Sequence, residues 1–265
     1  MVESTGDSRR KSIGIELTNT VVRRIAMSAL TVGPAVVPPE GPHFHYDAAP
    51  TLFARRRGRG PLWIAWDTNL LIDYFNYGER LWNGESLPDE LGRVGEELEG
   101  LQLVMSLWVI RHIRFRIPVG VLDDSKRKPL SPERRARRMH AWTEFELALQ
   151  LVADDEDGWP EPTSLVSGDL TDQLERVPAG NDRRLVDEAI RSGMHVFLTC
   201  DRGVLRARSQ VENLGLMIAS PLDLLEELGA AGALHCLFAP EYAVWPVPDQ
   251  QRVSHLIQAL AEDFE

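Results

Sequence analysis

The sequence contains few cysteines and no long apolar run. Cys200 and Cys236 are its only cysteines, so a disulfide framework is excluded and the usage fits a reducing compartment. No apolar stretch approaches the roughly 20 residues of a membrane helix. The mildly apolar stretch 25–37 is broken by Gly33 and Pro34 and lacks a small-residue cleavage site, which argues against a signal peptide. We therefore expect a cytoplasmic protein that does not associate with membranes.

Positive charge is in the minority, because 29 lysines and arginines face 40 acidic residues and the net charge is -11. A uniformly acidic surface would repel nucleic acid, so the distribution of charge decides what the protein can bind. Residues 111–138 are the exception, with ten basic against three acidic residues and a local charge of +7. This stretch is either a solvated helix face or a surface for a phosphate backbone. The candidate nucleic-acid contacts are Lys126, Arg127, Lys128, Arg134 and Arg135.

Three regions differ in composition. Residues 1–60 are rich in proline and end in an arginine cluster, which predicts an irregular N-terminal extension. Residues 61–228 carry the regular apolar patterns of one folded domain. Residues 229–265 are predicted to form a C-terminal tail with a final helix near 251–260.

Short apolar runs alternate with helical patterns in the central region. Continuous or alternating runs at 62–66, 113–117, 195–199 and 215–219 predict strands. Helices are predicted after Asp67 and over 91–112, 131–152, 181–193 and 222–228, several with capping residues at their ends. This order predicts an α/β fold with a parallel sheet.

Two of these strands end in aspartate. Asp67 follows the first strand, Asp201 follows a later one, and Asp182 opens the helix that leads to the later strand. Because parallel strands end at the same edge of a sheet, we expect these carboxylates to converge. Together they would raise one another's pKa values, a conflict that Mg²⁺ or Mn²⁺ relieves. Taken singly, Asp67 and Asp182 could equally be helix N-caps.

The same segments resemble a known family. Trp66-Asp67-Thr68-Asn69-Leu70-Leu71, Asp182 followed by Ala189, Phe197 to Arg202, and Gly215 to Ala219 with Pro221 are together similar to the PIN-domain nucleases. The resemblance covers roughly 61–228. It implies a PIN-like three-layer α/β/α sandwich with a central parallel sheet, carrying an N-terminal extension and a C-terminal tail.

The second acidic position of that family has two candidates here. Asp124 has the better spacing after Ile117 and Pro118, and Asp123 competes with it. The family usually has glutamate there, so this chain departs from the pattern. Both aspartates therefore stay candidates.

The resemblance also implies a chemistry. Asp67, Asp124, Asp182 and Asp201 would be the catalytic residues and would hold Mg²⁺ or Mn²⁺, which activates a water for phosphodiester hydrolysis. Asn69 and Thr199 would position carboxylates through side-chain hydrogen bonds. The expected activity is that of an endoribonuclease that leaves 5′-phosphate and 3′-hydroxyl ends on its RNA.

Other functions fit the same residues. A catalytically degenerate PIN module could serve as a binding or scaffold protein, and a DNA-directed nuclease would use the same acids. A toxin nuclease would have an antitoxin partner, although this chain is much longer than those toxins. A protein partner held by the extension or tail, and a homodimer, also stay open.

Overall fold

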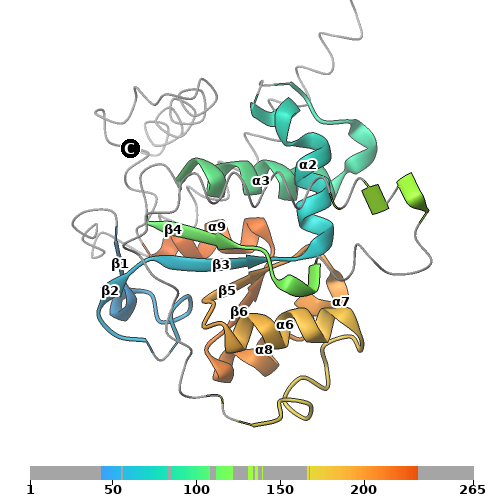
Figure 1. Ribbon diagram of the computed structural model, residues 1–265. Helices are drawn as coiled ribbons and strands as arrows, with labels where there is room; N and C mark the ends of the chain where they lie inside the picture. The colour runs from blue at the N-terminus through green and yellow to red at the C-terminus, as the bar shows by residue number, and fades with distance from the viewer. Residues whose placement is uncertain are drawn as a thin grey trace, which may run out of the picture. The chain divides into compact units, whose positions relative to one another are not determined.

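Four short parallel strands form a sheet with the order β4-β3-β5-β6 (Figure 1). They are β3 (Leu62–Trp66), β4 (Ile113–Arg116), β5 (Val196–Leu198) and β6 (Met217–Ala219). In the register, Ile64 pairs with Phe115 and with Val196, and Val196 pairs with Met217. The computed structural model describes residues 43–54, 56–82, 85–107, 112–121, 131–133, 135–136, 139, 166 and 168–231.

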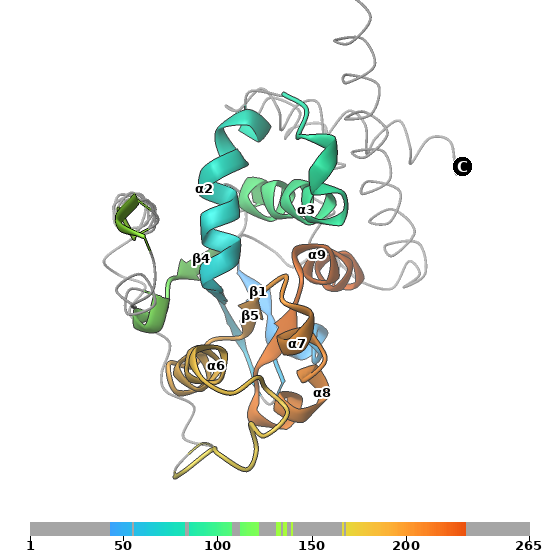
Figure 2. The ribbon, with the colours of Figure 1, turned by 90° about the vertical axis from the view of Figure 1, so that its right-hand side faces the viewer.

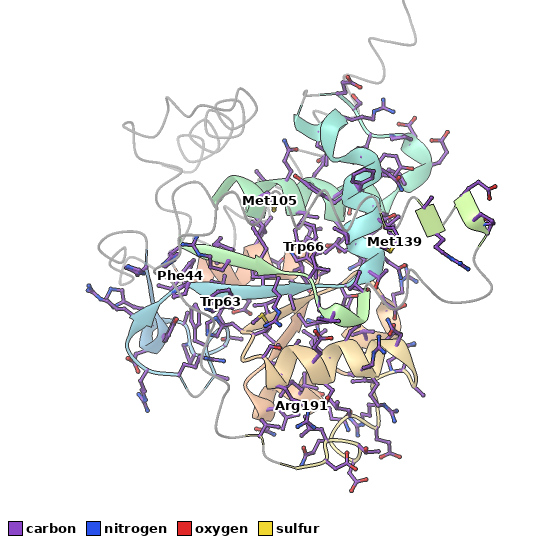
Figure 3. All side chains as sticks on the ribbon, viewed as in Figure 1. Phe44, Trp63, Trp66, Met105, Met139 and Arg191 are labelled. Carbon is purple, nitrogen blue, oxygen red and sulfur yellow. The ribbon has the colours of Figure 1, made fainter. Side chains whose placement is uncertain are left out.

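Burial in the strands follows the sequence pattern. All five residues of β3 are buried, as its uninterrupted apolar run predicts. In β4, Ile113 and Phe115 are buried, whereas Arg114 and Arg116 are only partly so. Trp66, labelled in Figure 3, packs edge-on against Tyr74 and Phe115 at ring-centroid distances of 5.5 Å. The predicted α/β fold with a parallel sheet is confirmed.

Helix α6 (Asn181–Arg191) lies against β5. Its apolar stripe of Leu185, Val186, Ala189 and Ile190 is buried, which is the pattern of an amphipathic helix. The helix ends before Gly193, which has φ 70°. The amides of Gly193 and Met194 donate to the carbonyls of Ile190 and Ala189, both at 3.0 Å. This is a Schellman motif, and it explains why the sequence predicts the helix end at a glycine.

Short helices connect β5 to β6. They are α7 (Arg202–Leu205), α8 (Arg208–Val211) and the 3₁₀ turn η3 (Glu212–Leu214). Both α7 and α8 lie against β6. Figure 2 views the edge toward which the strands point, with the starts of α6 and α7 at this edge. Residues that open these two helices therefore stand where the strands end.

The chain divides into two compact units. Unit 1 comprises 1–44, 76–112 and 221–265, and unit 2 comprises 45–75 and 113–220. The sheet and α6 to α8 belong to unit 2. Helix α2 (Thr68–Trp82) begins in unit 2 and ends in unit 1. The predicted boundaries at 60 and 228 stay predictions.

In unit 1, α3 (Arg93–Leu107) packs against α9 (Pro221–Ala230). A methyl group at Gly100 would lie 2.9 Å from the Leu222 side chain, so the glycine allows this close approach. The buried Glu97 carboxylate accepts the Leu222 amide of α9 at 3.1 Å. The 3₁₀ turn η2 (Asp89–Leu91) precedes α3.

Some predicted elements lie partly or wholly outside the described residues. The predicted extension is described only from His43, where β1 (Phe44–His45), η1 (Tyr46–Ala48) and β2 (Arg59–Gly60) form short elements, and β1 and β2 make a two-stranded sheet. The helix predicted over 131–152 is described only at scattered positions, of which Pro132, Glu133, Arg135, Ala136 and Met139 are helical. The tail beyond 231 lies outside. Within the described part, no helix has the length and apolar character needed to cross a membrane.

Candidate active site

Two neighbouring strands end side by side at the acidic residues. Trp66 of β3 pairs with Leu198 of β5, and both are the last residues of their strands. The Asp67 amide continues the ladder by donating to the Leu198 carbonyl at 2.9 Å. Asp67 and Thr199 are therefore brought together at one edge of the sheet, where ligands of parallel α/β sheets bind.

Thr199 links Asp67 to Asp201. Its hydroxyl donates to Asp67 Oδ2 at 2.7 Å and accepts the Asp201 amide at 3.0 Å. Thr199 is fully buried; its bond to Asp67 is buried as well, and its bond from the Asp201 amide is partly buried. The first is the side-chain contact expected of Thr199, and its effect on a metal centre stays a prediction.

Asp67 is a buried acid. The residue is only 4% exposed, and burial raises the pKa of its carboxyl to about 6. The negative charge of Asp182 raises the pKa further, whereas the Thr199 hydroxyl and the amides of Thr68 and Asn69 act in the opposite direction. Asp182 is the second residue of α6 and lies within electrostatic reach of Asp67. The charge of Asp182 thus acts on Asp67, and the convergence of Asp67, Asp182 and Asp201 on one site stays a prediction.

Asp201 is the N-cap of α7. Its Oδ1 accepts the amides of Gly203 at 2.6 Å and Val204 at 3.0 Å. These bonds explain why the helix starts here. No described residue donates a hydrogen bond to Oδ2 of Asp201. One carboxylate oxygen therefore fixes the helix start and the other has no partner in this part of the chain.

Asn69 lies on the surface at the start of α2. Its side chain is exposed and makes no hydrogen bond with a described residue. Its backbone amide, not its side chain, faces the Asp67 carboxylate. A positioning role for the Asn69 side chain stays a prediction.

The second acidic position and most of the basic stretch lie outside the described residues. This applies to Asp123, Asp124, Lys126, Arg127, Lys128 and Arg134. Arg135 is described and exposed. The described chain stops at Val121, within a helical turn at 119–121 that leads toward Asp123.

That turn is held by α6, through residues that the sequence does not single out. The Glu188 carboxylate accepts the Val119 amide at 2.6 Å and the Gly120 amide at 3.1 Å. Arg184 donates to the Gly120 carbonyl at 3.1 Å. In sequence, Glu188 is indistinguishable from other surface acids of an amphipathic helix, so no local signal could have found this role.

The chemistry of these residues suits a hard cation. Among the described residues, no group of three or more His, Cys, Asp or Glu side chains is arranged to hold a metal ion. Mg²⁺, however, commonly takes only one or two protein carboxylates and keeps several waters. Asp67, whose pKa is raised by burial and further by the charge of Asp182, fits that requirement together with Asp182.

Known proteins give no further guide. Comparisons of this chain with models of protein families, with curated proteins and with solved structures found no match.

Proposed function

We propose that this protein is a metal-dependent endoribonuclease with a PIN-like three-layer α/β/α fold. The observation that carries the proposal is the Asp67 carboxyl, buried at the carboxyl edge of the parallel sheet with a pKa raised to about 6 and a second acid in reach. An N-cap role would account for its contact with the first amides of α2. It would not account for the nearby Asp182, because a cap gains nothing from a second negative charge. Perturbed acids of this kind are typical of functional sites.

Asp67, Asp182 and Asp201 would hold the cation, with Asp124 or Asp123 as the further ligand. Thr199 keeps Asp67 in place and ties it to the backbone that carries Asp201. A bound Mg²⁺ or Mn²⁺ would lower the pKa of a water and offset negative charge on the phosphate. By the resemblance to PIN-domain nucleases, the products would carry 5′-phosphate and 3′-hydroxyl ends.

The basic stretch at 126–135 would contact the RNA backbone. Arg135 is exposed, and the stretch follows the turn at 119–121 that α6 holds. Electrostatic attraction to phosphate needs only local positive charge, so it is compatible with an acidic protein. A cytoplasmic location belongs to the same proposal.

The test is cleavage of single-stranded RNA with Mn²⁺, by the wild-type chain and by Asp67→Asn. We expect the variant to lose activity by about 100-fold or more, because it removes a charged ligand. Asp89→Asn is the matched control, since Asp89 is exposed in η2 and belongs to unit 1. Equal cleavage by all three proteins, or none by any, would overturn the proposal.

A second candidate is a noncatalytic PIN-like module that binds a partner. It is favoured by the absence, among the described residues, of three acids arranged around one point. Calorimetry with Mn²⁺ separates the two, because a scaffold predicts no heat that depends on Asp67. Single-stranded DNA of the same sequence in the cleavage assay tests the DNA-directed alternative.

A further inference from the structure

A pocket of about 280 Å³ lies beside α6 in unit 2. One wall is α6 and the other is the segment 169–174, and three of the lining residues are arginines. The residues that line the pocket are Asp169, Leu170, Thr171, Leu174, Gly180, Arg183, Arg184, Asp187 and Arg191. We call it the arginine pocket.

The arginine side chains are held by main-chain carbonyls. Arg183 donates to the carbonyls of Glu175 and Val177 at 3.0 and 2.9 Å. Arg191 donates to the Gly168 carbonyl at 2.9 Å, and Figure 3 shows it on the side of α6 that faces this segment. Each guanidinium has five donors, so these bonds fix the groups while further N–H donors stay available.

The pocket is positive in a protein that is negative overall. Its three arginines face two aspartates, which leaves a net charge of +1 against -11 for the whole chain. Both aspartates already accept hydrogen bonds from other residues of the pocket. The single Nε–H of Arg191 is shared between the two oxygens of Asp187, at 2.9 and 3.1 Å, and Asp169 accepts the Thr171 hydroxyl and amide. Arg183 meets no carboxylate among the described residues, so its charge is open to an anion.

The pocket follows α6 as far as its last residue, Arg191, and its other end reaches the start of α6, where the acidic site lies. Gly180, on the pocket wall, is the N-cap, and Asp182 and Arg183 follow within the first turn. A methyl group built on Gly180 would meet nothing within 4 Å, so the wall is open there. One strand could therefore contact both the pocket and the acids.

We propose that the arginine pocket binds a backbone phosphate of single-stranded nucleic acid and so holds the strand beside the acidic site. Arginine forks match the oxygens of a phosphate, and an anionic polymer is the ligand that a local positive pocket selects. The inference rests on the proposed nuclease function, which supplies the strand.

The test measures binding without metal, so that it does not depend on cleavage. A fluorescent RNA of about 12 nucleotides is titrated in EDTA and followed by anisotropy. We expect Arg183→Gln with Arg191→Gln to weaken binding about tenfold and to make the salt dependence shallower by about 0.7 per lost phosphate contact. The control is Arg206→Gln, an exposed arginine outside the pocket, which should bind as the wild type does. Equal affinities for all three would overturn the inference.

A second measurement uses the wild-type chain alone, in case the double variant misfolds. Phenylglyoxal modifies accessible arginines, and mass spectrometry locates the product. Bound RNA, or DNA of the same sequence, should protect Arg184 and Arg191 but not Arg206. Protection by inorganic phosphate alone, with none by either oligonucleotide, would overturn the inference.

The two proposals fail separately. If the arginine variants lose binding but the wild type cleaves nothing with Mn²⁺, the pocket stands and the nuclease proposal falls. If the wild type cleaves and the variants bind RNA normally, only the pocket inference falls.

Discussion

At Asp67, local stability conflicts with the proposed chemistry. Its carboxyl titrates near pH 6 in the folded chain, against a usual value of 3.8. The folded state therefore binds the proton more tightly than the unfolded state between these pH values. The protonated Asp67 carboxyl therefore stabilises the folded state fully below pH 3.8, and this contribution is lost as pH rises through about 6. At neutral pH the loss amounts to about 3 kcal/mol.

Asp67→Asn should therefore stabilise the protein at about pH 8, by up to this amount, because a neutral amide avoids the buried charge. The amide oxygen can still accept the Thr199 hydroxyl. Urea denaturation at about pH 8 and about pH 4 measures the effect, which should vanish at the lower pH. A variant less stable than the wild type at both pH values would contradict the assigned burial. If Asp67→Asn is more stable than the wild type and has lost cleavage, the native aspartate lowers stability for the sake of function.

Thr199 is the other residue whose effect can be isolated. Thr199→Val keeps the shape but leaves the Asp201 amide and the Asp67 carboxylate without their buried partner. We expect a loss of about 1–3 kcal/mol and a further rise in the Asp67 pKa. Denaturation and carboxyl-detected NMR titration measure the two effects.

Thr199→Ser is the matched control, because it keeps the hydroxyl. It should retain a pKa of Asp67 close to the wild-type value. If Ser and Val shift that pKa equally, the hydroxyl bond is not what sets it.

Among the elements, α6 has three separate roles. Its buried stripe packs on the sheet, its first turn carries Asp182, and Glu188 with Arg184 holds the turn at 119–121. A methyl group at Gly120 would lie 2.6 Å from the buried Leu185 side chain, so the turn sits as close to α6 as glycine allows. Contacts with α6 therefore hold the backbone turn that directly precedes Asp123 and Asp124 in the sequence.

Glu188→Ala should free this turn with little loss of global stability. Val119 is exposed, so water can replace the acceptor there, whereas Gly120 is buried, and we expect a cost of about 1 kcal/mol. Hydrogen exchange of the Val119 and Gly120 amides should become faster. Glu212→Ala, at an exposed glutamate of η3, should leave that exchange unchanged. Unchanged exchange in Glu188→Ala would show that the turn is held by other contacts.

At the scale of the molecule, a second cluster forms at the opposite end of the sheet. His195, just before β5, is 1% exposed and accepts the Trp63 amide on Nδ1 at 2.9 Å. Tyr46 and Phe53 pack on its ring at centroid distances of 5.3 and 4.9 Å. Burial lowers the pKa of His195 well below 6.5. The described part of the extension in unit 2 therefore packs at the amino ends of the strands.

The change of folding stability with pH that His195 causes is opposite in direction to the change that Asp67 causes. The folded pKa of His195 is depressed, so its contribution is present above pH 6.5 and is lost as pH falls, at about 1.4 kcal/mol per pH unit. Below about pH 6 the two groups therefore change stability in opposite directions. We predict that acid destabilises Asp67→Asn more steeply than the wild type, as measured by urea denaturation.

His195→Gln is the complementary variant, since glutamine can accept the Trp63 amide without titrating. It should become more stable as pH falls toward 4. His45→Gln is the control, because His45 is only partly buried, and it should keep the wild-type profile. A profile for His195→Gln that matches the wild type would show that His195 is not the acid-sensitive group.

The elements could be predicted because their causes are local. The run at 62–66, the alternation at 113–116 and the stripe of α6 closed by Gly193 each depend on residues a few positions apart. The placement of Asp67, Asp182 and Asp201 toward one edge of the sheet could also be expected, because parallel strands end at one edge.

Contacts between distant positions arise only in the folded chain. Glu188 meets Val119 and Gly120 across 69 and 68 residues, and His195 meets Trp63 across 132. The arginine pocket and the burial of Asp67 likewise require several segments at once. A sequence pattern records which side chains are available at each position. Which of them meet, and how far water is excluded from them, is decided by long-range packing, because no local preference distinguishes one acid on a helix face from another.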